Sequence, residues 1–553
     1  MIKLLKEPMT QNSRKELLIK SLMGRAEVYN LIGKSKEAIR DLEIAKAIAK
    51  RMGFKKFEVD SLLQLSSVYG SISRYEDMLN LATIALSFYK EINDKVGETD
   101  CLINIGYAYN SLGNYSRALI YHTRSLRLTE TTGNCQQQAN SLNNIGYVHR
   151  VLGNYLKAIK CYTKSLKIRE KIGDLRGQAI SLINIGGVYR FLGDHCATLE
   201  HLSKSLKIQE KIGDLWGQAY SLNNIGFVYK ILGNYREAIE YLDKSLKIQK
   251  KIGDRYGEAT SLSNLGSIHY RLANYREAIE YITKSLRIQK EIGDQDGQAI
   301  SLNDIGLIHH RNGNYSKALE YYKRSLRIRE EIGERYGLAH SLNNIGRNYL
   351  EQEKYNQARK FFTRAKKVAQ EIGAKEILQK VNLAFGEIEI AQNNINKAKK
   401  YTTKALNLAL GLNSKAGKAE ALLLQARILN QGLLRVIKGD EGLSGDVRGI
   451  FGEDTRWQIV DMRFKEAIKI FEELRQPFDL AKAYYYYGEC LLRRTEVRDK
   501  IPRPFGERAG VRGQEEEKGA TEYLQKAKEI FKKIGAKQWF AKVKELCSKI
   551  KNY

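Results

Sequence analysis

Proline is scarce in this sequence, with only four among 553 residues, so few positions force a helix to break. The six cysteines show no paired spacing, which argues against a disulfide framework. No stretch approaches the roughly 18 consecutive apolar residues that a membrane-spanning helix needs. The first residues, MIKLLKEPMTQNSRKELL, also lack the apolar stretch of a secretory signal. These shortages favour a helix-rich protein that is reduced and cytoplasmic.

Acidic residues are outnumbered as well, because 93 lysines and arginines face 63 aspartates and glutamates, a net charge of +30. Such an excess is typical of proteins that bind nucleic acid, an anionic membrane surface or acidic peptides. The excess is spread along the chain and is densest at residues 134–173, where seven basic residues accompany one acid. There Lys164, Lys167 and Lys171 follow the i, i+3, i+7 spacing of one exposed helix face. This face is either a solvated surface or a track for nucleic acid.

Motifs of known enzyme classes are also missing. The sequence contains no HExxH, GxSxG or CxxC pattern, which would mark metalloprotease, hydrolase or redox sites. His195, Cys196 and His201 lie close together, but no fourth zinc ligand accompanies them. We therefore predict no catalytic residue, no metal ligand and no cofactor, and we expect that the chain is not an enzyme.

What the sequence has in abundance is a repeat. Glycine recurs every 40 residues, at Gly106, Gly146, Gly186, Gly226, Gly266, Gly306, Gly346 and Gly386. A fixed period of this length indicates one supersecondary unit copied end to end, as in a solenoid. Ordering 40 residues costs on the order of 40–80 kcal/mol of backbone entropy, so a single copy is not expected to be stable and its neighbours must cover both of its faces.

Each copy is predicted to be a helical hairpin. In residues 214–253, Leu222, Ile225 and Tyr229 share one helix face at i, i+3 and i+7, and a second apolar face follows over 238–248. Between the two helices, Asn234 with Glu237 has the spacing of an N-terminal capping box. Gly253 followed by Asp254 predicts a left-handed helix end and then an acidic cap for the next helix.

The segment SLNNIGFVYKILGNYREAIEYLDKSL resembles a tetratricopeptide repeat. The family's signature places are held by Leu222, Ile225, Gly226, Tyr229, Ala238, Leu242 and Ser245. The repeat here has 40 residues where the common form has about 34, and it lacks the signature proline after the second helix. This longer form resembles the repeats of Partner-of-Inscuteable adaptors, kinesin light chains and bacterial signalling proteins. The resemblance implies an all-α, right-handed α-solenoid.

The repeat also predicts the domain organisation. We expect an N-terminal tail at 1–13 and ten 40-residue units over 14–413. Two degenerate units follow over 414–536, with exposed glycine-rich insertions at 431–460 and 494–518. A capping helix is expected at 537–553.

In tetratricopeptide arrays the first helix of each repeat lines the concave groove, so the resemblance implies that ligand contacts come from one face of these helices. One polar side chain per repeat falls on this face: Asn104, Asn144, Asn184, Asn224, Asn264, Asp304 and Asn344. Basic residues follow one to two turns later, at Arg150, Arg190, Lys230, Arg271 and Arg311. Amides can bond a peptide backbone, and guanidinium groups can hold a carboxylate. The asparagines could equally bond a neighbouring helix, so their role stays open.

The predicted function is a non-catalytic interaction scaffold or adaptor, in signalling or complex assembly. It would hold a peptide segment of a protein partner, possibly acidic, in the groove. One alternative is a nucleic-acid-binding helical repeat that uses the basic face. Another is a regulatory subunit that senses a peptide and changes its superhelical pitch.

Overall fold

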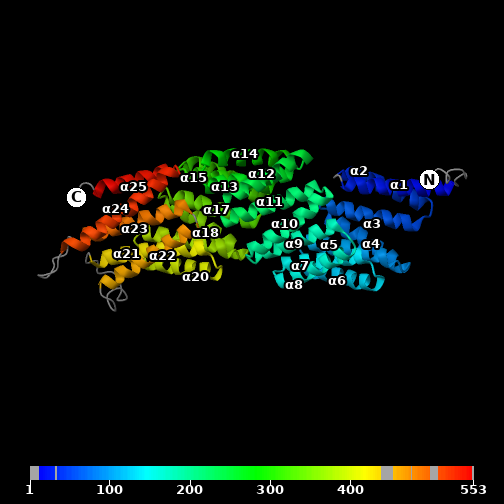
Figure 1. Ribbon diagram of the computed structural model, residues 1–553, viewed down its shortest axis with the longest axis horizontal. Coiled ribbons are helices and arrows are strands. Elements are labelled where there is room, and N and C mark those ends of the chain that lie inside the picture. The colour runs from blue at the N-terminus through cyan, green and yellow to red at the C-terminus, as the bar shows by residue number, and fades with distance from the viewer. Residues whose placement is uncertain (1–10, 32–33, 438–452, 475, 499–508, 551–553) are drawn as a thin grey trace. The chain divides into compact units, whose positions relative to one another are not determined.

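The protein is an all-α solenoid of helical hairpins (Figure 1). The computed structural model describes residues 11–31, 34–437, 453–474, 476–498 and 509–550, and within these ranges it contains 25 α-helices and no strand. The chain divides into two units, Met1–Leu232 (unit 1) and Gly233–Tyr553 (unit 2). The 40-residue period runs unbroken through position 232, so the sequence did not predict this division.

Unit 1 contains eleven of the described helices. They are α1 (Gln11–Leu31), α2 (Ser35–Arg51), α3 (Lys55–Ser71), α4 (Tyr75–Glu91), α5 (Lys95–Ser111), α6 (Tyr115–Thr132), α7 (Cys135–Val151), α8 (Tyr155–Lys171), α9 (Leu175–Phe191), α10 (His195–Ile212) and α11 (Leu215–Leu232).

Unit 2 contains the other fourteen. They are α12 (Tyr235–Ile252), α13 (Arg255–Arg271), α14 (Tyr275–Glu291), α15 (Gln295–Arg311), α16 (Tyr315–Glu331), α17 (Arg335–Leu350), α18 (Tyr355–Glu371), α19 (Lys375–Ala391), α20 (Ile395–Gly411), α21 (Lys415–Ile437), α22 (Glu453–Glu473), α23 (Pro477–Arg498), α24 (Ala509–Lys533) and α25 (Lys537–Ile550).

The helix ends follow the predicted capping chemistry in most copies. Gly253 has a φ of +72° and ends α12, and the Asp254 carboxylate then accepts the Gly257 N–H at 2.9 Å to cap α13. The expected capping box at Asn234 is wrong, because Asn234 occupies the cap position but its side chain makes no capping hydrogen bond. The 20-residue rhythm of turns therefore depends mainly on the glycines and on the acidic caps.

Glycine inside the first helices is explained by close packing. A Cβ atom at Gly306 would lie 2.7 Å from the buried Tyr322 ring and 3.3 Å from the backbone oxygen of Ala318. The sequence pointed to the small alanine as the reason for this glycine. The structure shows that the nearer neighbour of Gly306 is Tyr322, four residues after that alanine. The same holds at Gly146, where a Cβ atom would lie 2.8 Å from the Tyr162 ring.

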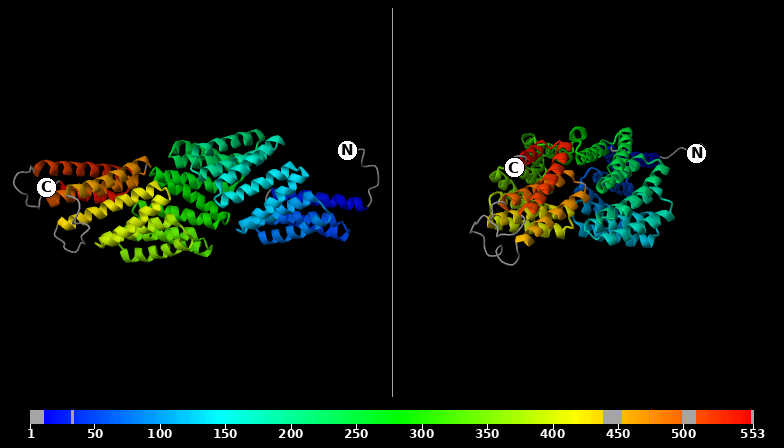
Figure 2. Two further views of the ribbon diagram at one scale, coloured as in Figure 1. Left: turned by 90° about the horizontal axis from the view of Figure 1, so that it is seen from below. Right: turned by 60° about the vertical axis from the view of Figure 1, so that its left-hand side comes forward.

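The hairpins stack so that the first helices lie on the inside of each unit. Within each unit, most odd-numbered helices touch the next odd-numbered helix, while contacts of this extent are not made between even-numbered helices. Helices on the inner side of a curved stack are closer to their counterparts, so the odd-numbered helices form the concave side. We call them the inner row. Figure 2 shows the yellow to red helices at the end of unit 2 stacked side by side.

The last hairpins of unit 2 depart from the 40-residue period but keep the same packing. Helices α21 to α25 bury one large cluster that includes Phe464, Phe531 and Trp539. Both predicted insertions are narrower than expected, since α21 and α22 extend into 431–460, and α23 and α24 extend into 494–518. The middle parts, 438–452 and 499–508, lie outside the described residues. Helix α25 buries Trp539 and Val543.

Candidate functional site

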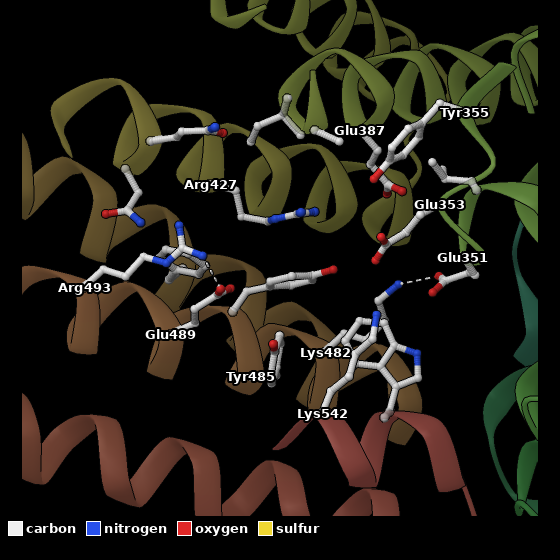
Figure 3. Close-up of a pocket in the computed structure, with 18 residues that line it drawn as sticks. Glu351, Glu353, Tyr355, Glu387, Arg427, Lys482, Tyr485, Glu489, Arg493 and Lys542 are labelled. Carbon is white, nitrogen blue, oxygen red and sulfur yellow. Dashed lines mark hydrogen bonds and ion pairs between the residues drawn. The ribbon is translucent and has the colours of Figure 1, made fainter. Parts of the chain in front are cut away.

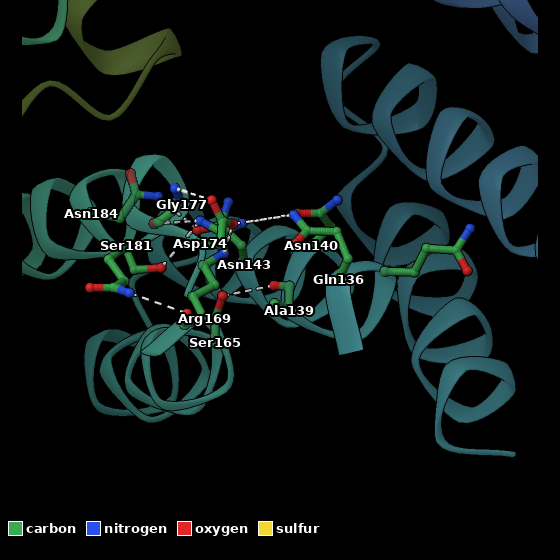
Figure 4. Close-up of polar contacts among 12 residues, drawn as sticks. Gln136, Ala139, Asn140, Asn143, Ser165, Arg169, Asp174, Gly177, Ser181 and Asn184 are labelled. Atoms are coloured by element: carbon green, nitrogen blue, oxygen red, sulfur yellow. Dashed lines mark hydrogen bonds and ion pairs between the residues drawn. The ribbon is translucent and has the colours of Figure 1, made fainter. Parts of the chain in front are cut away.

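The predicted amides lie on the inner row, where each is half-buried. In unit 1, Asn184 donates a hydrogen bond to the Asn143 side-chain oxygen at 2.9 Å, which links α9 to α7 (Figure 4). Asn104 donates to the Ser67 hydroxyl at 3.0 Å and so links α5 to α3. Asn224 instead bonds the Tyr220 carbonyl within its own helix. Asn104 and Asn184 therefore link neighbouring repeats, the structural role that the sequence left open, whereas Asn224 does not.

Arg169 of α8 links two neighbouring helices of the inner row. Its side chain is only 4% exposed, and it donates to the Gly177 carbonyl at 2.6 Å and to the Asn140 side-chain oxygen at 2.9 Å (Figure 4). The Arg169 guanidinium on α8 therefore bonds to both α7 and α9. The next repeat has Gln209 at this place, where its side-chain oxygen accepts the Ser221 hydroxyl at 2.8 Å.

The predicted cations of unit 1 are interleaved with aromatic rings. The Arg150 guanidinium lies 4.9 Å from the ring centre of Tyr147 and 5.8 Å from that of Phe191. Arg190 then lies between the rings of Phe191 and Phe227, at 4.9 and 5.6 Å, and the Lys230 ammonium lies 4.4 Å from Phe227. We call these six side chains the cation–aromatic ladder. Stacking on a ring orients a guanidinium while leaving its N–H edge available.

The helices that carry the cation–aromatic ladder contain no acidic residue. Helices α7, α9 and α11 contain no aspartate or glutamate, and among the described residues neither Arg150 nor Arg190 forms an ion pair. The rings are also accessible, since Tyr147 is 40% and Phe191 is 49% exposed. The inner row of unit 1 therefore presents positive charge and apolar surface together.

The predicted residues of unit 2 are arranged differently. Asn344 donates to the Asn303 side chain at 2.9 Å, as in unit 1. Arg311 lies 3.9 Å from the Phe478 ring and donates to Tyr270 at 3.1 Å and to Asp479 at 3.4 Å, so α23 covers it. Arg271 is exposed. Arg271 and Arg311 each stand five residues after the helix glycine, whereas Arg150 stands four after it, and this offset turns them by about 100° around the helix.

Unit 2 also contains a partly open cavity of about 350 Å³, lined mainly by helices α17, α19, α21, α23 and α25 of the inner row (Figure 3). Charged residues of both signs line it, and most of them are paired. Lys482 lies 3.1 Å from the Glu351 carboxylate, and Arg493 lies 2.6 Å from the Glu489 carboxylate. A smaller adjoining cavity, which shares Glu351 and Lys482, is lined by the predicted residues Asn344 and Arg311.

The electrostatics of this cavity follow from burial and from the cations. Burial alone would raise the pKa of Glu351, but Lys482, His310 and Arg347 together lower that pKa to about 2. Burial lowers the pKa of the His310 imidazole to about 4. At neutral pH this part of the cavity therefore holds a carboxylate, cations and a neutral imidazole.

Sequence reasoning missed most residues of the cavity. Arg347 follows Gly346 directly, at the place that Tyr147 and Phe227 occupy in unit 1, so the repeat register could have placed it on the inner row. Helix α21 carries Glu420 and Arg427 seven residues apart, which puts them on one face. Lys482 carried no such signal, because its hairpin had lost the 40-residue period.

Among the described residues, no group of three or more His, Cys, Asp and Glu side chains is arranged to hold a metal ion. None of the helices in the described part of the chain combines the length and the apolar character needed to cross a membrane.

Comparison with known families agrees with this architecture. Family models described as tetratricopeptide repeat match residues 99–132, 137–211, 217–291 and 297–371. Among curated proteins, no relative matches the chain in sequence.

Several solved structures are similar in fold. A signal-transduction ATPase with a tetratricopeptide-repeat sensor from Pyrococcus horikoshii is 18% identical, with a TM-score of 0.50 over 68% of this chain and 56% of that chain. This chain thus spans little more than half of that relative. A Rap protein complexed with competence and sporulation factor is 17% identical, with a TM-score of 0.44 over 64% and 98% of the two chains. Yeast Tom70 is 15% identical, with a TM-score of 0.37 over 93% and 96%.

Proposed function

We propose that this chain, a tetratricopeptide-repeat protein, is a non-catalytic scaffold that binds an acidic segment of a partner protein along the inner row of unit 1. The observation that carries the proposal is the cation–aromatic ladder on three helices that contain no acid. Cations held beside accessible aromatic rings offer both charge and apolar contact to a partner.

The amide row supports the same proposal. Each asparagine side chain has two N–H donors and an oxygen with two lone pairs. Asn184 gives one donor to Asn143, so it retains an oxygen and a second N–H for a ligand. A structural bond between repeats and a bond to a peptide backbone are therefore compatible. We infer that Asn104, Asn144, Asn184 and Asn224 contact an extended backbone while Arg150, Arg190 and Lys230 take its carboxylates.

The other predicted residues contribute less to this proposal. Arg311 already donates to Tyr270 and Asp479, so only part of its guanidinium is left for a ligand. Asn264, Asp304, Asn344 and Arg271 remain predicted contacts of unit 2.

The groups that would contact a ligand are already held in position by the fold. The ladder side chains stack on rings and the amides bond across repeats, so little side-chain freedom is lost when a ligand binds. Affinity should come from several modest contacts along the row. Because the cations are partly exposed, binding should weaken as salt is added.

A charge-reversal pair tests the proposal. Arg150, Arg190 and Lys230 are changed to Glu in one variant, and the exposed outer residues Lys164, Lys167 and Lys171 are changed to Glu in the other. Both variants change the net charge equally. A random twelve-residue peptide display library is selected on the unaltered protein, and the enriched peptides are measured by fluorescence anisotropy.

We expect enrichment of Asp and Glu among the selected peptides, and a loss of at least ten-fold in affinity only in the inner-row variant. Equal losses in both variants would mean that general charge, not this site, attracts the peptides. Enrichment without acidic residues would refute the proposal. Tighter binding of a single-stranded oligonucleotide than of any selected peptide, abolished by the inner-row variant, would instead assign the ladder to nucleic acid.

A further inference from the structure

One face of α21 lines the cavity of unit 2 and its smaller neighbours. The residues on this face are Glu420, Leu423, Leu424, Arg427, Asn430 and Gln431. Their spacing follows i, i+3, i+4 and i+7, so they form a single stripe along the helix. Three of them carry polar groups that the fold does not use.

Arg427 is the first of these. Its guanidinium lies 3.9 Å from the centre of the Tyr486 ring, and it forms no hydrogen bond or ion pair with any described residue. Figure 3 shows it reaching toward the middle of the cavity without a dashed contact. By contrast, Arg347 lies 3.4 Å from Glu387 and Lys482 lies 3.1 Å from Glu351. Arg427 is therefore an oriented donor with all its N–H groups unused.

Asn430 lies one turn further along the same face. It is only 8% exposed, and its side-chain oxygen is buried without a hydrogen-bond partner in the described protein. Buried acceptors are rarely left unpaired, because the cost of removing them from water is then not recovered. Asn343, 4% exposed, has a second unpaired side-chain oxygen in the adjoining cavity. Both oxygens can therefore accept a hydrogen bond from a ligand.

Glu420 lies two turns before Arg427. Its carboxylate lines both adjoining cavities and forms no hydrogen bond or ion pair with a described residue. Burial raises its pKa, and Asp479 adds to that effect. A cation placed beside Glu420 would stabilise the ionised carboxylate, so this end of the stripe favours a positive group.

We propose that α21 binds a short mixed-charge peptide segment, with a peptide carboxylate on Arg427, a peptide N–H on the Asn430 oxygen and a peptide cation on Glu420. Seven residues of helix separate Glu420 from Arg427, which is about 10.5 Å along the axis. An extended peptide covers about this distance in three residues. The segment therefore carries a basic and an acidic side chain three positions apart.

The walls of the cavity suit such a ligand. The cavity at Arg427 and Asn430 has a volume of about 350 Å³, and the adjoining cavity at Glu420 has about 200 Å³. Both are small for ligand sites, so together they take a few residues and not a folded domain. Tyr485, Tyr486 and Trp539 supply apolar surface beside the charges. The site lies entirely in unit 2, so it does not depend on the acidic segment proposed for unit 1.

The test uses the full-length protein labelled with 5-fluorotryptophan. The chain has three tryptophans, and of these Trp539 lines the cavity, Trp216 lies in unit 1, and Trp457 lies in the cluster beneath. The probes are acetyl-Lys-Ala-Ala-Asp-amide and its reverse, acetyl-Asp-Ala-Ala-Lys-amide. Acetyl-Lys-Asp-Ala-Ala-amide has the same composition with the wrong spacing.

We expect one of the two spaced peptides to shift the Trp539 fluorine signal saturably, and the wrongly spaced peptide to bind at least ten-fold more weakly. Arg427→Gln should weaken binding at least ten-fold. Lys418→Gln, on the same helix but paired with Glu466 at 2.8 Å, should not. The signals of Trp216 and Trp457 report whether each variant is folded.

Three results would overturn the proposal. They are the absence of a Trp539 shift with either spaced peptide, equal binding of all three peptides, and full binding by a folded Arg427→Gln variant. A shift confined to Trp216 would place binding in unit 1, which would sink this site without affecting the function proposed for that unit.

Discussion

Arg169 offers the sharpest test of how the repeats are held together. Its fork bonds Asn140 on α7 and the Gly177 carbonyl on α9, and its Nε lies 3.8 Å from Asp174. Arg169→Ala removes these bonds and leaves the half-buried Asn140 side-chain oxygen without its donor, while the Gly177 carbonyl keeps its bond within α9. An unpaired buried polar group costs about 1–3 kcal/mol. The variant also no longer buries a charge, which offsets part of this loss, so we expect a net destabilisation of about 2–3 kcal/mol.

The sequence supplies a matched control, because Gln209 occupies the same place one repeat later. There the glutamine oxygen accepts the Ser221 hydroxyl, and Ser181 is the equivalent partner for residue 169. Arg169→Gln should therefore lower the free energy of unfolding by no more than about 1 kcal/mol, because one neutral hydrogen bond replaces the charged hydrogen bonds of the arginine.

Native-state hydrogen exchange is the appropriate assay, because a repeat array opens locally and has no single unfolding transition. Protection should fall in α8 and α9 of Arg169→Ala and stay unchanged in α1 and α2. Equal protection in Arg169→Ala and the unaltered protein would refute the account of the network. A uniform loss of protection throughout unit 1 would show that the Arg169 network does not act locally.

Four further changes have expected outcomes in thermal melting or chemical denaturation. Ser73 has a φ of +62° at the place that Gly113 and Gly153 hold in the next two repeats, so Ser73→Gly should stabilise unit 1 by about 1 kcal/mol. Gly306→Ala should destabilise unit 2 by about 1–3 kcal/mol, because the added Cβ meets the Tyr322 ring, and an unchanged melting temperature would contradict the packing. Burial lowers the pKa of His122 to about 4, so stability should fall as the pH drops from about 6.5 toward 4, where the unfolded chain alone takes up the proton, and His122→Phe should remove this dependence. Burial raises the pKa of Glu420 in the folded chain, so the unfolded chain loses this proton at a lower pH than the folded chain does. The free energy of unfolding should therefore fall as the pH rises above about 4.3. Glu420→Gln should melt at a higher temperature than the unaltered protein at pH 7 and at the same temperature near pH 4.

Much of the architecture could be predicted because it is local. The 40-residue period, the glycine after each helix and the acidic caps are short-range signals, and each specifies one hairpin and the turn to the next. The match of tetratricopeptide-repeat models to 99–132, 137–211, 217–291 and 297–371 confirms the family resemblance. The amide row was predictable for the same reason, since one residue per repeat in constant register must fall on one face.

The cavity of unit 2 could not be predicted in this way. Its contacts join residues far apart in the chain, such as Lys482 with Glu351 and Arg311 with Asp479. No period connects these positions, because the last hairpins have lost it. The burial of Asn430 and the stacking of Arg427 on Tyr486 likewise depend on where α23 packs.

The sequence by itself thus determined the hairpin, its repetition and the inner face, because hydrophobic period and turn chemistry act within about 40 residues. Only the tertiary structure decided which polar groups on that face are used and which are left unpaired. Arg311 and Arg427 are alike as sequence, yet one is bonded to α23 and the other is open to a ligand. That difference depends on the packing of distant helices, and only three-dimensional contact can set it.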